Sequence, residues 1–247
     1  MAFRVASYNI HKGIGGVDRR YRPERIVETL NRYNPDIVLM QEVDDEVPRS
    51  RKDCQVELFA DALEMKYHAY QRNVSLKQGH YGNAILSRFP LTDVQNINLT
   101  IPLKKRRRGL LAHCLLKFDG HQRTVLIANL HLGLAGFERK MQLRKILEHE
   151  TIRHTHRHTP MIIGGDYNDV WGTLGKLIMI PAGFKPAGKA IRTFPAAFPA
   201  RALDNLFYRG DLKSDHAFAS RSKIASQASD HLPLIVDFEL TNLAFGP

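Results

Sequence analysis

The sequence predicts an α/β sandwich, with β-sheets in the middle and α-helices outside. Short apolar runs alternate with amphipathic stretches along all 247 residues, and neither an internal repeat nor a low-complexity linker interrupts them. Several strands follow one another directly, which disfavours a purely parallel, doubly wound sheet. The length suits a single domain spanning residues 1–247, since α/β enzymes of this size often fold as one unit.

Strands are expected where apolar residues run together. The segment 36–43 contains Ile-Val-Leu-Met, which is typical of a strand buried on both faces. The other expected strands are 3–8, 83–87, 110–118, 123–130, 161–164, 203–208 and 232–240.

Three helices are expected between these strands. The first covers 23–33, where Pro23 suits the opening turn and the apolar residues form one stripe. A second covers 56–65, and the longest runs from Gly136 to about Ile152. The inward face of the longest helix is predicted to carry Met141, Leu143, Ile146 and Leu147.

Composition and charge narrow the classes of function. No stretch approaches the roughly 20 apolar residues that span a bilayer, and the N-terminus lacks the pattern of a secretory signal. Two cysteines cannot form a disulfide framework or a four-thiolate zinc site, so a reducing cytoplasm is expected. The net charge of +11 predicts attraction to polyanions, although it also serves solubility.

Polar residues follow nearly every apolar strand at once. Strand ends are where such folds build sites, because rigid backbone holds side chains that loops leave accessible. Carboxylates, amides and histidines suit a hard cation such as Mg²⁺ or Mn²⁺ and a phosphate ester held on it. The clusters are 7–11, 41–44, 129–131, 164–169, 203–205 and 229–231.

These ordered clusters resemble the endonuclease/exonuclease/phosphatase superfamily of metal-dependent phosphoesterases, to which deoxyribonuclease I belongs. The resemblance covers the chain from about Val5 to Phe238 and is strongest to small bacterial members, which share the motifs at 9–13, 82–88 and 192–195. It implies a four-layered sandwich, in which two packed, mainly antiparallel sheets are flanked by helices.

The resemblance also implies roles for individual residues. Asn9, Glu42 and Asp230 would form the site for Mg²⁺, with Mn²⁺ as the alternative ion. A carboxylate at the mouth of a buried strand, such as Glu42, needs a cation or donors in any case. Asp166 and His231 would hold and activate the attacking water. The remaining catalytic residues would be Asn168 and His131, which stabilise negative charge, and Asp204, which orients His231.

Two further residues are candidates for substrate binding. Asn83 would position a phosphate oxygen or simply close a turn, and Lys12 would face the substrate phosphate or lie solvated on its loop. The basic run 104–108 would follow a nucleic-acid backbone or an anionic membrane, with a solvated hairpin tip as the default interpretation.

The expected reaction is hydrolysis of a phosphodiester by in-line attack of water, of nuclease type. Phospholipid or sphingolipid phosphodiester hydrolysis and phosphomonoester hydrolysis are the alternatives, and a non-catalytic nucleic-acid-binding module is a second alternative. The expected partners are a phosphoester substrate, nucleic acid among the candidates, and a membrane contacted at its surface. A monomer is expected.

Overall fold

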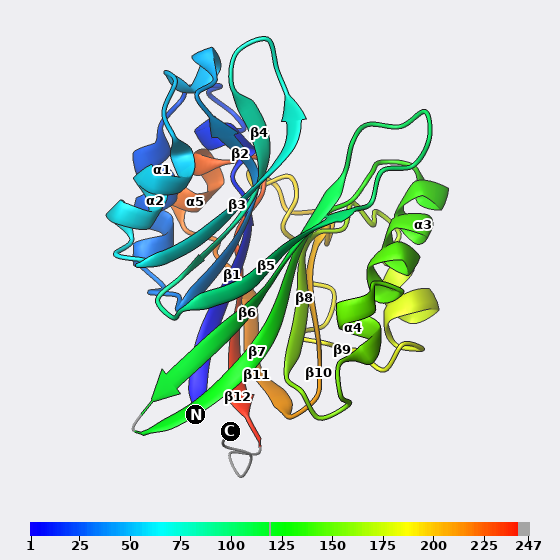
Figure 1. Ribbon diagram of the computed structural model, residues 1–247. Helices are drawn as coiled ribbons and strands as arrows, with labels where there is room; N and C mark the ends of the chain where they lie inside the picture. The colour runs from blue at the N-terminus through cyan, green and yellow to red at the C-terminus, as the bar shows by residue number, and fades with distance from the viewer. Residues whose placement is uncertain (119, 242–247) are drawn as a thin grey trace.

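Two six-stranded sheets form the framework of the molecule, and the computed structural model describes residues 1–118 and 120–241 (Figure 1). The first sheet has the order β11 (Leu212–Ala219), β12 (Leu234–Leu240), β1 (Ala2–Asn9), β2 (Ile37–Asp45), β4 (His80–Ser87) and β3 (Tyr67–Ser75). The second has the order β5 (Leu91–Asn98), β6 (Arg108–Phe118), β7 (His121–His131), β8 (Met161–Asp166), β10 (Asp204–Arg209) and β9 (Lys185–Pro186).

Each sheet has a parallel pair at its centre and antiparallel pairs elsewhere. β1 pairs in parallel with β2, and β7 pairs in parallel with β8. The predicted sandwich of two mainly antiparallel sheets is therefore confirmed. Because the strands of a parallel pair end on the same side, each pair brings two polar strand ends together.

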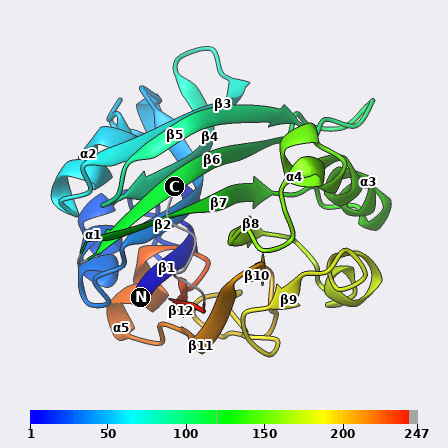
Figure 2. The same ribbon diagram turned by 60° about the horizontal axis from the view of Figure 1, so that its bottom comes forward.

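Helices cover the outer face of each sheet, as Figures 1 and 2 show. The first sheet carries α1 (Pro23–Asn31), α2 (Gln55–Ala62) and α5 (Lys223–Ala228). The second carries α3 (Gly136–Leu147), α4 (Glu150–His154) and the π-helical turn η3 (Gly175–Met179). Short 3₁₀ turns η1 (His11–Gly13) and η2 (Pro48–Ser50) follow β1 and β2. No helix in the described part of the chain is long and apolar enough to cross a bilayer.

The main core lies between the two sheets. Alternate residues of β1 and β2, such as Val5 and Leu39, meet residues of β7 and β8, such as Ile127 and Ile162. The residues that point to the opposite face of each strand pack against the helices. This two-sided burial explains why the central strands have almost continuously apolar sequences.

A buried polar bridge joins the sheets close to the site. Gln41 Nε2 donates to Asn129 Oδ1 at 2.7 Å. Asn129 Nδ2 donates in turn to the carbonyl oxygens of Met40 and Ala84, each at 2.8 Å. Gln41 directly precedes Glu42 on β2, and Asn129 is two residues before His131 on β7. The bridge therefore sets the distance between the strand ends that carry Glu42 and His131.

The longest predicted helix differs from expectation in two respects. It is interrupted after Leu147, because His149 adopts an extended conformation before α4 begins. Met141 was expected to face inward and is exposed, so this prediction is wrong. Leu143 and Ile146 are buried and Leu147 packs against the same core, as predicted, whereas the other buried residues of α3 are polar.

Candidate active site

The predicted catalytic residues meet at one end of the sandwich. Asn9 ends β1, His131 ends β7 and Asp166 ends β8. Asp204 opens β10 directly opposite Asp166 in the antiparallel register, and His131 pairs with Asp166 in the parallel one. His231 lies in the loop that leads into β12. The strand order therefore gathers residues separated by up to 222 positions, from Asn9 to His231.

Asp166 is the centre of this cluster. Asn9 Nδ2 donates to Asp166 Oδ2 at 3.0 Å, and the same oxygen lies 3.6 Å from His131 Nε2 and 3.8 Å from His231 Nε2. The other carboxylate oxygen accepts a hydrogen bond from the backbone N–H of Asn168 at 2.9 Å. Burial raises the pKa of Asp166, although His231 and His131 act in the opposite direction. A carboxylate held in this way is suited to accept a proton.

Asp204 orients His231. His231 Nδ1 lies 2.8 Å from Asp204 Oδ2, which also accepts a hydrogen bond from Thr193 Oγ1 at 2.5 Å. The ring of Phe194 packs on the imidazole with 4.9 Å between the centroids. Burial opposes the imidazolium charge, but Asp204 and Asp166 outweigh it and raise the pKa of His231 to about 10. His231 is therefore a cationic donor at neutral pH.

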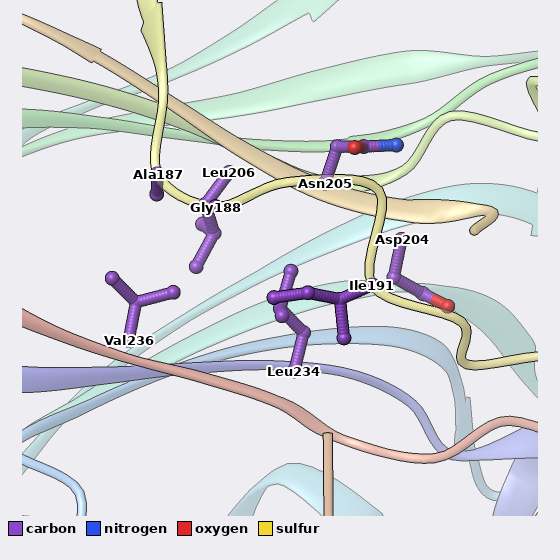
Figure 3. Close-up of a pocket in the computed structure, with 8 residues that line it drawn as sticks. All are labelled: Ala187, Gly188, Ile191, Asp204, Asn205, Leu206, Leu234 and Val236. Atoms are coloured by element: carbon purple, nitrogen blue, oxygen red, sulfur yellow. The ribbon is translucent and has the colours of Figure 1, made fainter. Parts of the chain in front are cut away.

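A small cavity lies beside Asp204. Figure 3 shows a cavity between the sheets beside Asp204, lined by Ile191 and Leu234 among other aliphatic residues. Its volume of about 10 Å³ leaves room for about one water molecule, so the cavity is too small for a substrate.

His131 differs from His231 in charge. Burial and the nearby positive charge of Arg107 lower the pKa of His131 to about 4. Its Nδ1 has no hydrogen-bond partner among the residues that the structure describes. His131 is therefore a neutral imidazole at pH 7, whereas His231 is an imidazolium, and the two rings face the same carboxylate oxygen.

Glu42 sits at a distortion in β2. It is the extra residue of a β-bulge between Gln41 and Val43, and its φ of 60° is in the left-handed region. Such strained positions occur at functional sites. The Lys12 ammonium donates to Glu42 Oε2. Burial alone would raise the pKa of Glu42, but His131, which is protonated at low pH, together with Lys12 and His11 lowers it to about 2.

The donors around Glu42 fit a magnesium ion. The Glu42 carboxylate already binds a cation, the Lys12 ammonium, and the amide of Asn9 is on the adjacent strand end, where Asn9 pairs with Gln41. Within residues 1–118 and 120–241, no group of three His, Cys, Asp or Glu is placed to hold a metal. A Mg²⁺ site typically has only one or two oxygen ligands from the protein, because the ion keeps several waters and substrate oxygens in its coordination shell.

Other predicted residues lie at the edge of this cluster or below it. The Asp230 carboxylate is 4.0 Å from His11 Nδ1, and no contact joins it to Glu42, so its role as a ligand stays a prediction. Asn83 is fully buried and donates to Gln71 and to the carbonyl of Arg108. Its role in substrate binding also stays a prediction, as does that of Lys12.

Asn168 approaches the site through its backbone. Its φ of 49° turns the chain sharply after Tyr167, and its side-chain Nδ2 donates to the carbonyl oxygen of Leu132 at 2.9 Å. This bond ties the loop after β8 to the loop after β7. The predicted contact of the Asn168 amide with a phosphate oxygen stays a prediction.

Sequence reasoning gave no role at the site to Arg107 or to Thr193, which lies in the shared motif 192–195. Arg107 belongs to the basic run 104–108, whose default interpretation was a solvated hairpin tip. That interpretation is wrong for Arg107, which is buried and acts on His131 and Tyr81. Its backbone carbonyl accepts a hydrogen bond from Leu99 N at 2.9 Å, which places it at the base of the hairpin. Nothing in five consecutive basic residues distinguishes this one.

Comparisons with known proteins agree with the geometry. The uncharacterized protein YbhP of Escherichia coli (strain K12) is 27% identical over 251 residues, covering 97% of each chain. An endonuclease/exonuclease/phosphatase from Beutenbergia cavernae has a TM-score of 0.83 at 20% identity, covering 98% of this chain and 72% of that one.

A second solved structure is similar in fold. ANGEL2, described as a 2',3'-cyclic phosphatase in complex with adenosine-2',3'-vanadate, has a TM-score of 0.77 at 16% identity, covering 98% of this chain and 96% of that one. A sequence model of the Endonuclease/Exonuclease/phosphatase family matches residues 6–231. With that span of the sequence matched, the chain belongs to the endonuclease/exonuclease/phosphatase family.

Proposed function

We propose that the protein hydrolyses a phosphodiester by direct attack of water, with a divalent metal at Glu42. Family membership supports a metal-dependent phosphoester hydrolase. The observation that carries the proposal is the convergence of Asn9, His131 and His231 on the Asp166 carboxylate. One buried proton acceptor surrounded by donors is an arrangement for water activation next to a charged phosphoryl group.

Asp166 and His231 take different parts in the reaction. Asp166 accepts a proton from the attacking water as the new bond to phosphorus forms, and the bond from phosphorus to the leaving oxygen breaks. His231 is cationic and points Nε2 toward the same place, so it stabilises the charge that develops on the phosphoryl oxygens. Asp204 holds that ring in one orientation.

Metal and neutral donors complete the site. When bound at Glu42 and Asn9, Mg²⁺ would polarise a phosphate oxygen and stabilise the leaving oxygen. His131 stays neutral and donates a hydrogen bond without adding charge. Glu42 offsets the charge of Lys12, and Asp44 offsets the charge of Arg49 at 2.7 Å. That balance favours a singly charged phosphodiester over a dianionic monoester.

Two classes of diester are candidates. Nucleic acid is supported by the net charge of +11 and by the exposed run 104–106. A phospholipid is supported by exposed apolar side chains on the loops that follow His131 and Asn168.

The test compares substrates in parallel. A chromogenic phosphodiester, a chromogenic phosphomonoester, plasmid DNA and phospholipid vesicles are each incubated with Mg²⁺, Mn²⁺ or chelator. We expect metal-dependent turnover of a diester that His231→Ala abolishes and that His216→Ala, an exposed histidine on β11, leaves intact. Turnover of the monoester alone, or equal rates in the His231→Ala variant, would overturn the proposal.

A further inference from the structure

Large apolar side chains are exposed on three neighbouring segments at the site end of the second sheet. We call them the apolar rim, which comprises Leu103, Leu134, Phe137, Met141 and Trp171. The exposed fractions are 80% for Trp171, 73% for Leu134 and 55% for Phe137. Single exposed apolar residues are ordinary, but several on adjoining segments indicate an interaction surface.

The first half of helix α3 presents apolar residues outward and polar residues inward, although Leu143 and Ile146 in its second half are buried. Phe137 and Met141 are one turn apart on the exposed face, whereas Glu138, Arg139 and Gln142 are buried. A helix that only covered a sheet would have the opposite pattern in this half. Packing against the sheet therefore does not explain Phe137 and Met141.

The buried polar side chains hold the loop after His131. Gln142 Oε1 accepts a hydrogen bond from Gly133 N at 2.8 Å, and Arg139 Nη1 donates to the carbonyl of Leu134 at 2.5 Å. Gln142 Nε2 donates to Glu138 Oε1 at 3.2 Å. These bonds fix the backbone at Leu134, whose side chain is exposed to solvent.

Direct contacts join the three segments into one surface. The Lys104 ammonium lies 5.2 Å from the centre of the Phe137 ring, and Lys145 Nζ donates to the carbonyl of Thr100 at 2.9 Å. The bond from Asn168 to Leu132 joins the loop of Trp171 to the loop of Leu134. Figures 1 and 2 both show the loop between β5 and β6 lying beside α3.

Positive charges accompany the apolar rim. Lys104, Lys105 and Arg106 are exposed next to Leu103, and Lys140 and Arg144 are exposed on α3 beside Phe137 and Met141. We call these five residues the basic border. Apolar side chains mixed with lysine and arginine are typical of protein surfaces that bind anionic membranes, where the apolar groups enter the interface and the cations contact headgroups.

We propose that the apolar rim and the basic border dock the protein on a membrane that contains anionic phospholipid. A nucleic acid would contact the cations and stack on Phe137 and Trp171, but it would leave the aliphatic side chains Leu103, Leu134 and Met141 in water. A membrane interface accommodates all five. Leu134 is three residues after His131 and Trp171 is three residues after Asn168, so docking would hold the active site over lipid headgroups.

The sequence supplies its own reporter, because Trp171 is the single tryptophan of the chain. Its fluorescence is recorded with phosphatidylcholine vesicles, with vesicles that also contain phosphatidylglycerol, and with a single-stranded oligonucleotide. Chelator is present throughout, so neither turnover nor metal bridging contributes. We expect a shift to shorter wavelength with the anionic vesicles only.

Variants test whether the apolar rim and the basic border are responsible for membrane binding. Leu134→Ser combined with Phe137→Ser is expected to lower partitioning into anionic vesicles by about tenfold or more. Replacing Lys104, Lys105 and Arg106 by alanine is expected to lower it by about fivefold for each charge. Matched controls elsewhere on the surface, Val94→Ser and the triple alanine variant of Lys66, Lys117 and Lys213, are expected to bind like the unmodified chain.

Three results would overturn the docking proposal. They are an unchanged Trp171 spectrum with anionic vesicles, equal partitioning of the apolar variant whose fold is verified by circular dichroism, and quenching by the oligonucleotide without any vesicle response. The last result would identify nucleic acid as the occupant. Because the assay contains no turnover, its failure is separate from a failure of the proposed hydrolase activity.

Discussion

Replacing Asp204 by asparagine should convert His231 from a cation to a neutral imidazole at pH 7. The two side chains are buried and 2.8 Å apart, and asparagine keeps the shape of Asp204 while removing its charge. Burial already acts to lower the pKa of His231, and Asp204 is foremost among the groups that raise it to about 10. Without that charge, burial dominates, and we expect the pKa to fall below 6.5.

The magnitude follows from the size of this shift. A rise from 6.5 to about 10 corresponds to about 5 kcal/mol in favour of the imidazolium. A pKa raised on folding stabilises the protein fully below the unfolded value of 6.5, and the contribution is lost as the pH rises through about 10. The metal-free protein should therefore exceed the Asp204→Asn variant in stability by several kcal/mol at pH 6, with the difference vanishing near pH 10.

Two measurements test this reasoning. Nitrogen-15 NMR of the metal-free protein follows the protonation of the His231 ring between pH 5 and 10.5, and urea unfolding at pH 6 and pH 9.5 gives the stability. Asp237→Asn, which removes a carboxylate from the Arg4 ion pair on the other side of the sheet, is the control. A titration of wild-type His231 near pH 6.5, or an unchanged titration in Asp204→Asn, would refute the argument.

Three further outcomes are expected. Glu42→Gln should weaken Mn²⁺ binding, measured by calorimetry, by about tenfold or more, because it removes the charged ligand; unchanged affinity would place the metal elsewhere. Arg107→Met should raise the pKa of His131, followed by NMR, above about 4, because a repelling charge is lost; a static value would show that burial alone sets it. Asn129→Ala should lower the free energy of unfolding in urea by about 2–4 kcal/mol, because Gln41 and two carbonyl groups lose buried partners; a loss below about 0.5 kcal/mol would contradict the importance of this bridge.

The central strands and the polar residues at their ends could be predicted from the sequence. A buried strand such as β2 has a continuous apolar run, which is a local signal, and the residue that follows it stands at the sheet edge whatever the partner strands are. The local pattern therefore placed Asp166 and His131 at strand ends, and the resemblance to the family implied their roles.

Edge strands could not be predicted in the same way. β5 and β11 have one face in solvent. Polar residues make up most of β5 and half of β11, so neither strand has the long apolar run of a central strand. Their extended form depends on pairing with β6 and β12. Tertiary pairing of this kind leaves little trace in a local pattern.

The electrostatic partners were also hidden. Lys12 is 30 positions before Glu42, and Arg107 is 24 positions before His131, so neither pair has a sequence spacing that signals contact. The inverted pattern of α3 was hidden for another reason, because an apolar residue such as Met141 is assigned to the core whenever helical spacing allows. Its exposure became visible only in the structure.

The most direct test of the central claim is the rate of Mg²⁺-dependent hydrolysis of a phosphodiester by Asp166→Asn. The substitution keeps the shape of the side chain and removes the proton acceptor on which Asn9, His131 and His231 converge. We predict a loss of about 10³-fold in kcat, with Asp93→Asn on exposed β5 unaffected. A rate for Asp166→Asn within a few-fold of the unmodified protein would contradict the account.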